Sequence, residues 1–133
     1  MSQTNASAAD IRAVIEAWAT AVQREDIDAI VASHAPDMIM FDVPPPTELR
    51  GIDAYRDSWA PFFENFRKGG VFAIERLDVT SGDSVAFATA LLRCGTREEL
   101  AKDPKVRLRL TVGLRKEAGR WVIAHEHHSF PLS

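Results

Sequence analysis

The sequence predicts an α+β fold in which helices cover one face of a curved antiparallel sheet. In the first half of the chain apolar residues recur at helical spacing, and in the second half they alternate at strand spacing. The chain has 133 residues, of which 46% are hydrophobic and 26% charged, and this suits a single domain, 1–133, with its own core.

Composition excludes several classes of partner. A net charge of −3 argues against a nucleic-acid or anionic-membrane surface. The first residues lack the basic and apolar regions of a signal peptide, and no apolar run approaches the ~20 residues of a membrane span. The single cysteine, Cys94, precludes an internal disulfide and indicates a reducing compartment. We therefore expect a cytoplasmic protein without nucleic-acid or membrane partners.

The N-terminal part predicts two helices. Residues 1–8 are small and polar and predict a flexible leader. Apolar residues on one face predict a helix over 9–26, with Ser7 as its N-cap. A second, short helix has Asp26 as N-cap and ends before Pro36, because the residue before a proline is disfavoured in helical geometry.

A strand and a third helix follow. The run MIMFDV (38–43) predicts a short strand that ends at the three prolines 44–46, which have no N–H for a sheet ladder. The aromatic-rich segment 52–66 predicts a helix with a kink at Pro61, and it ends at the glycines 69–70.

The second half predicts a meander of strands. Hairpin turns are indicated at 81–83 and 117–119, and the segment 95–105 predicts a longer connection with one helical turn. The four predicted strands are 71–79, 84–94, 105–116 and 120–130.

The last hairpin predicts a polar group on one sheet face. If Ala118 and Gly119 form a two-residue loop, Glu117 faces Arg120 and the register is fixed. The register then predicts two cross-strand pairs, Thr111 with Glu126 and Arg109 with His128.

This polar group has two interpretations: a solvated outer face with ordinary charge pairs, or the wall of a cavity. A bulge in the hairpin would move Glu126 and His128 to the other face. That other face is too apolar to meet water and predicts a dimer interface, or else a cover of helices. Its apolar residues are Leu108, Leu110, Val112, Leu114, Trp121 and Ile123.

The order of these segments resembles the ketosteroid isomerase and SnoaL-like branch of the nuclear transport factor 2-like superfamily. The resemblance covers nearly the whole chain and rests on REDIDAIVASHAPD, MIMFDVPPPTELRG, the aromatic-rich helix and LRKEAGRWVIAHEHHSF. It implies a cone in which a curved antiparallel sheet wraps around three N-terminal helices, with a pocket at the wide end. It also implies cofactor-free proton transfer and a homodimer.

The resemblance assigns expected roles to single positions. Asp42 matches the family's catalytic aspartate, which takes a proton from the carbon beside a carbonyl and returns it elsewhere on the same molecule. Trp18 stands where the family's tyrosine donates to the enolate oxygen, and Thr111 where a protonated aspartate assists it. Trp59 falls where the family often has a pocket tyrosine. The base is therefore expected to be kept and the oxyanion hole to be replaced.

The residues themselves support a limited set of candidates. Partial burial after an apolar strand would make Asp42 a better proton acceptor, whereas the alternative is an aspartate that caps a loop. The predicted catalytic residues are Asp42, Glu126 and His128. The predicted ligand-binding residues are Trp18, Met40, Trp59, Phe63, Arg93, Arg109 and Thr111, although tryptophans on an apolar helix face are usually core residues.

His125 and His127 form a possible metal-binding pair. Two histidines that are two residues apart on a strand share a face and can bind zinc, with His34 or an acid as a third ligand. Histidines in such pairs are more often structural, so we expect no metal and no cofactor, and His125 and His127 to face a second subunit or the helices. Cys94 is interpreted as structural.

The leading hypothesis is a cofactor-free isomerase-type, cyclase-type or dehydratase-type enzyme. It would act on a small hydrophobic or polycyclic molecule, with a pocket carboxylate for proton transfer. The alternative is a non-catalytic ligand-binding or dimerisation domain of the same fold.

Overall fold

The computed structural model describes residues 3–132 of the chain. Its helices are α1 (Gln3–Gln23), α2 (Ile27–Val31), α3 (Ile52–Asp57), α4 (Trp59–Phe66) and α5 (Arg97–Lys102). Its strands are β1 (His34–Phe41), β2 (Leu49–Arg50), β3 (Gly70–Ser81), β4 (Val85–Thr96), β5 (Leu108–Glu117) and β6 (Arg120–Ser129).

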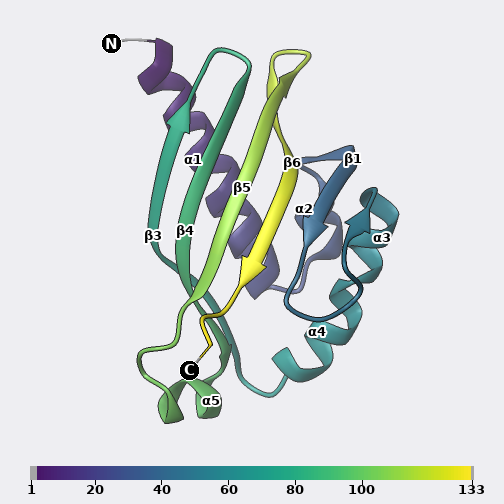
Figure 1. Cartoon of the computed structure of the whole chain (residues 1–133), viewed down its shortest axis with the longest axis vertical. Helices are drawn as coiled ribbons and strands as arrows, with labels where there is room; N and C mark the ends of the chain where they lie inside the picture. The colour runs from purple at the N-terminus through teal and green to yellow at the C-terminus, as the bar shows by residue number, and fades with distance from the viewer. Residues whose placement is uncertain (1–2, 133) are drawn as a thin grey trace.

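The strands form one curved six-stranded sheet in the order β2-β1-β6-β5-β4-β3 (Figure 1). Neighbouring strands are antiparallel, but β1 and β6 pair in parallel, so the sheet is mixed. Helix α1 lies along one face of the sheet, where it contacts β3 and β6, and α3 packs beside β1. The predicted class, α+β with helices against a curved sheet, is confirmed.

The apolar face of β5 and β6 is an interior surface of the chain itself. Its residues Leu108, Leu110, Val112, Leu114, Trp121 and Ile123 are each 6% exposed or less. They form one core with the apolar side of α1 and with the aromatic residues of α3 and α4. The argument that this face needs a second subunit is therefore wrong, because the helices cover it.

The first helices begin differently from the prediction. Helix α1 starts at Gln3, within the segment predicted as a leader, and residues 1–2 lie outside the described part of the chain. Ser7 lies inside the helix, so the prediction that it is the N-cap is wrong. The Asp26 cap of α2 is confirmed, since its carboxylate accepts a hydrogen bond from the Ala29 N–H at 3.2 Å.

Two prolines lie inside elements without breaking them. Strand β1 already begins at His34 and contains Pro36. Its pairing with β6 is interrupted between His34 and Ile39, so the N–H that Pro36 lacks is not needed for the sheet. The predicted third helix is divided at Ser58 rather than kinked at Pro61. Pro61 is the third residue of α4, and N–H groups in a first turn have no intrahelical acceptor.

A β-bulge decides which side chains of β6 face the interior. The predicted pairing of Glu117 with Arg120 is confirmed. Farther from the turn, Leu114 pairs with Ile123 but Gly113 pairs with His125, so Ala124 is an extra residue.

The bulge overturns the predicted polar group. Beyond it, Val112 lies opposite Glu126 and Leu110 opposite His128, whereas the predicted partners were Thr111 and Arg109. The two predicted pairs are therefore wrong, because one extra residue turns every following side chain to the opposite face. Glu126 and His128 consequently point into the buried, helix-covered side of the sheet.

The connection between β4 and β5 contains the predicted helical turn. It is α5, and a capping box begins it: Thr96 Oγ1 accepts from the Glu99 N–H, and the Glu99 carboxylate accepts from the Thr96 N–H. Among the helices of residues 3–132, none is long and apolar enough to cross a membrane.

Candidate functional site

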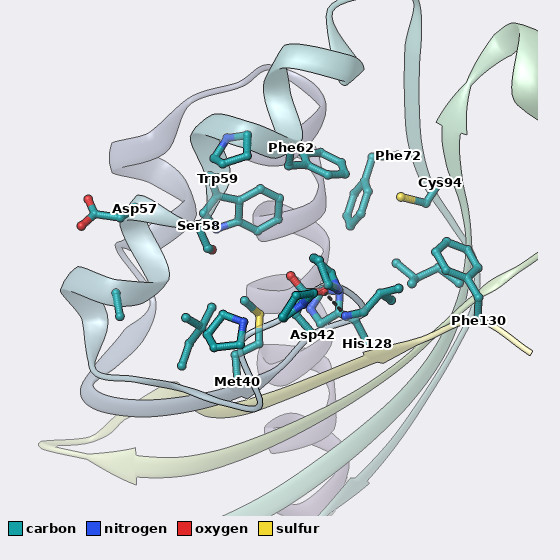
Figure 2. Close-up of a pocket in the computed structure, with 18 residues that line it drawn as sticks. Met40, Asp42, Asp57, Ser58, Trp59, Phe62, Phe72, Cys94, His128 and Phe130 are labelled. Carbon is teal, nitrogen blue, oxygen red and sulfur yellow. Dashed lines mark hydrogen bonds between the residues drawn. The ribbon is translucent and has the colours of Figure 1, made fainter.

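A largely apolar cavity of about 740 Å³ lies between α3, α4, the loop after β1 and the inner face of the sheet (Figure 2). Trp59, Phe62, Phe72 and Phe130 supply aromatic walls, and the prolines 44–46 lie along the loop. The polar residues of the lining are Asp42, Asp57, Ser58, Cys94 and His128. A cavity of this size and composition suits a small, mostly apolar molecule.

Asp42 and His128 lie next to each other at this cavity (Figure 2). Asp42 directly follows the last residue of β1 and is half-buried, and one of its carboxylate oxygens accepts the N–H of Val43 at 2.8 Å. His128 is near the end of β6 and is 7% exposed. One cavity is thus lined by both a carboxylate and an imidazole, in apolar surroundings.

Glu126 lies behind His128 and has no exposed surface. Its Oε1 accepts from His128 Nε2 at 2.8 Å, and its Oε2 accepts from the Tyr55 hydroxyl at 2.7 Å and from His34 Nε2. A buried charge without partners is strongly destabilising, so these three donors make a carboxylate tolerable at this place.

Burial and hydrogen bonds act in opposite directions on Glu126. Burial raises the pKa of Glu126, but the hydrogen bonds from His128 and His34 lower it more, and the resulting pKa of about 2 lies below the ordinary 4.5. Glu126 is therefore an anion at neutral pH, inside the protein.

The buried anion acts in turn on His128. Burial alone lowers the pKa of His128, but the hydrogen bond and the charge of Glu126 raise it more, and the nearby charge of Asp42 adds to the rise. The protonated imidazolium is thereby favoured at the wall of the cavity.

Trp18 and Tyr55 extend this network away from the cavity. Trp18 Nε1 donates to the Tyr55 hydroxyl at 2.9 Å, and both side chains are buried. Burial, together with the charge of Glu126, raises the pKa of Tyr55 well above its ordinary value, so the phenol stays a donor. Trp18, a predicted ligand-binding residue, contacts Trp59 edge-on but lies outside the cavity lining.

The other predicted ligand-binding residues fall into two groups. Met40 and Trp59 line the cavity, as do the predicted catalytic residues Asp42 and His128. Phe63, Arg93, Arg109 and Thr111 lie outside its lining.

The four residues outside the lining have other contacts. Phe63 is a core residue at 2% exposure. The Arg93 guanidinium donates to backbone carbonyls of the α5–β5 connection, including that of Val106 at 2.6 Å. Arg109 and Thr111 lie on the outer face of β5, where Arg109 donates to the Ser129 hydroxyl at 3.1 Å.

The histidine pair of β6 lies on the outer face of the sheet. His127 is exposed, and His125 Nδ1 is 2.8 Å from the Ile39 carbonyl oxygen. The Phe41 ring contacts both imidazoles edge-on. His34, the candidate third metal ligand, is buried beside Glu126 on the inner face, so it does not join the pair.

Cys94 lines the cavity as a protonated thiol. Burial raises its pKa to about 12, and the charges of Asp42 and Glu99 act in the same direction. A thiol that is not ionised is a poor nucleophile, in keeping with a structural role.

The places of Tyr55 and His34 in the Glu126 network were not predicted from the sequence. Tyr55 shares its helical spacing with the apolar residues of α3, so periodicity indicates only that it is buried. A buried tyrosine normally finds a hydrogen-bond partner, and this was the available signal for its place in a polar network.

Comparison with known proteins identifies the family. Residues 11–133 match the family model of the SnoaL-like domain. The chain belongs to the family of SnoaL-like domains. A search of curated proteins found no significant match to this SnoaL-like domain.

Solved structures share its fold over nearly the whole chain. An NTF2-like protein of unknown function from Pseudomonas putida KT2440 is 32% identical, with a TM-score of 0.88, and the match covers 99% of this chain and 92% of that one. A protein of unknown function with a cystatin-like fold from Nostoc punctiforme PCC 73102 is 15% identical (TM-score 0.80; 100% and 97% covered). A ketosteroid isomerase-like protein from Erwinia carotovora atroseptica SCRI1043 is 21% identical (TM-score 0.71; 95% and 97% covered). The resemblance and the NTF2-like fold that the sequence predicted are therefore confirmed.

Proposed function

We propose that this SnoaL-like domain binds a small, largely apolar carbonyl compound and catalyses a cofactor-free proton transfer on it. The reaction class is isomerisation, or a related cyclisation or dehydration. The observation that carries the proposal is that Asp42 and His128 line the same apolar cavity, with the buried anion Glu126 hydrogen-bonded to His128. Cavities with a few convergent polar groups and perturbed pKa values are typical of active sites.

Asp42 is the general base in this proposal. Its carboxylate takes a proton from the carbon beside the carbonyl, the C–H electron pair becomes a C=C bond, and the carbonyl π pair moves onto the oxygen as an enolate. Asp42 then returns the same proton to another carbon of the molecule, so no co-reactant is consumed. The apolar walls exclude water and favour this exchange.

His128 takes the place of the missing oxyanion donors. Trp18 is bonded to Tyr55 and Thr111 lies on the outer face, so neither residue is placed to donate to an enolate in the cavity. The imidazolium of His128 lines the cavity and supplies positive charge where the enolate oxygen develops. Turnover is then expected to fall as the pH rises through the raised pKa of His128.

The walls also suggest the charge of the ligand. Within the described residues, the lining contains the carboxylates of Asp42 and Asp57 but no lysine or arginine. We therefore propose an uncharged ligand, since the two carboxylates outnumber the single imidazolium of His128 and would repel a carboxylate or phosphate.

The experiment compares Asp42→Asn, His128→Gln and Ser58→Ala on an activated cyclic ketone, with binding of a planar apolar fluorophore as a second readout. Asp42→Asn is expected to lower kcat by about 10²–10⁴ and His128→Gln by about 10²–10³, with binding retained. Ser58→Ala, the control at the same cavity, is expected to change kcat less than about tenfold.

A non-catalytic ligand-binding domain is the second candidate. It is favoured by the hydrogen bond from the Val43 N–H to Asp42, which is also what a carboxylate that orders a loop would make. Fluorophore binding without turnover, or turnover that is unchanged in Asp42→Asn, would support this candidate and remove Asp42 from the mechanism.

A further inference from the structure

The hydrogen bonds behind the cavity are all donated toward Glu126, and the proposed mechanism does not depend on this orientation. Glu126 receives hydrogen bonds from three elements: from His34 on β1, from Tyr55 on α3 and from His128 on β6. An ionised carboxylate only accepts hydrogen bonds, so each of these partners must present its proton to Glu126.

This requirement fixes the tautomer of His128. Its Nε2 is 2.8 Å from Glu126 Oε1, so Nε2 carries the shared proton. Within residues 3–132, Nδ1 of the same ring has no hydrogen-bond partner, and the side chain lines the cavity. Nδ1 is therefore the ring nitrogen that is free to meet a molecule in the cavity.

The other two donors keep Glu126 in its accepting state. His34 and Tyr55 both approach Oε2, whereas His128 uses Oε1, so the three donors do not compete for one oxygen. Trp18 Nε1 donates to the Tyr55 hydroxyl and thus directs the phenol proton toward Glu126. The five side chains are each buried, at 7% exposure or less.

We propose that His34 and Tyr55 are positioning residues: by donating to Glu126 they keep its carboxylate an acceptor for His128 Nε2–H, so that Nδ1 of His128 meets the substrate. This inference rests on the proposed function in one respect, namely that His128 is the imidazole that contacts the substrate. The other titratable groups that line the same cavity as His128 are Asp42, after β1, Asp57, on α3, and Cys94, on β4.

The proposal predicts the direction in which each variant acts. When one of its donors is removed, fewer hydrogen bonds stabilise the negative charge of Glu126. The carboxylate then attracts the Nε2–H proton of His128 more strongly and stabilises the imidazolium. His34→Phe and Tyr55→Phe should therefore each raise the titration midpoint of His128.

The test is NMR of the full chain labelled with ¹⁵N, using long-range ¹H–¹⁵N spectra of the four histidine rings over a pH titration. In the unmodified protein the neutral His128 ring should carry its proton on Nε2. Each variant should move the His128 midpoint upward by about half a pH unit or more. His127→Phe makes the same replacement on the outer face and should leave the midpoint unchanged.

Two results would overturn the proposal: a neutral His128 protonated on Nδ1, or a midpoint that stays or falls in Tyr55→Phe. Tyr55→Phe keeps the ring and decides the question alone if His34→Phe does not fold. The titration needs no substrate, so a failure here is distinct from unchanged turnover in Asp42→Asn, which would contradict the proposed function instead.

Discussion

Glu126 is a buried carboxylate on which three hydrogen bonds of the interior depend. Its carboxylate has no exposed surface, and three buried donors surround it. In such a cluster, removal of the charge leaves several donors without an acceptor of matching strength. The cost therefore extends beyond one hydrogen bond.

Glu126→Gln is expected to lower the free energy of unfolding by about 2–4 kcal/mol near pH 5.5. Because the folded-state pKa of Glu126 is lowered from 4.5, its contribution is present above about pH 4.5 and is lost as the pH falls toward about 2. Because the pKa of His128 is raised from 6.5, the contribution of its positive charge is present below about pH 6.5 and is lost as the pH rises through the higher folded value.

Urea unfolding of the two proteins between pH 2 and pH 9 checks this. The difference in stability should be largest between about pH 4.5 and pH 6.5 and should shrink on both sides. A difference that is constant with pH would show that Glu126 is not an ionised partner of His128 in the folded protein.

At this scale the sequence predicted part of the site. Met40, Asp42 and Trp59 line the cavity, as the strand end, the helix pattern and the resemblance indicated. His128 lines it too, but through a register that differs from the predicted one. His34 could not be assigned in the same way. Its contact with Glu126 joins residues 92 positions apart, and such a contact depends on a parallel strand pairing that the sequence pattern does not reveal.

At the scale of elements, a single extra residue decides which side chains of β6 face the interior. The two-residue turn fixed the pairing of Glu117 with Arg120, but Ala124 shifts the register farther along β6. Side chains alternate with a period of two, so an odd insertion exchanges the buried and exposed sets. Periodicity predicts strands well, but a bulge is a local irregularity that alternation alone does not locate.

Helix α5 tests how much a local cap contributes. Thr96→Ala removes the side-chain acceptor of the capping box and is expected to lower the free energy of unfolding by about 1 kcal/mol. Urea unfolding measures the change. Lys102→Ala, at the exposed end of the same helix, is the control and should change stability by less than about 0.5 kcal/mol. Equal effects of the two variants would contradict a specific role of the cap.

At the scale of the molecule, the outer face of the sheet is the surface available for self-association. Among the described residues, Val85 and Phe87 on β4 are 64% and 50% exposed, and Phe41 on β1 is 37% exposed. These apolar side chains stand on the face opposite to the helices. The apolar face of β5 and β6, which was first expected to form the dimer interface, lies inside the core of the chain. A homodimer therefore stays a prediction, now placed on the outer face.

Phe87→Asp is expected to convert a dimer into a monomer of unchanged fold, because a charge at the centre of an apolar interface opposes association. Light scattering coupled to size-exclusion chromatography measures the mass, and circular dichroism checks the fold. Leu132→Asp is the control, an apolar residue that is fully exposed and lies after β6. A Phe87→Asp protein with the same mass as the unmodified chain would exclude this face as the interface.

The fold class, the hairpins and the presence of most elements could be predicted from the sequence, because they follow from local periodicity and turn residues. The boundaries were less accurate: α1 begins at Gln3 and β1 at His34, before their predicted starts. The two-residue strand β2 was missed, since so short a segment carries no period. The parallel pairing of β1 with β6 was missed as well, because it joins distant segments whose local patterns contain no information about their partner.

The place of β6 in the sheet has a consequence for biosynthesis. Strands β1 and β2 connect to the remainder of the sheet through β6, which follows all other strands in the sequence. While the ribosome is still making residues 120–129, β1 has no neighbour on that side, and neither Glu126 nor His128 exists to complete the interior. The nascent polypeptide therefore holds an unfinished sheet edge until its sixth strand emerges, and the wall of the cavity that His128 supplies is completed only when that strand is in place.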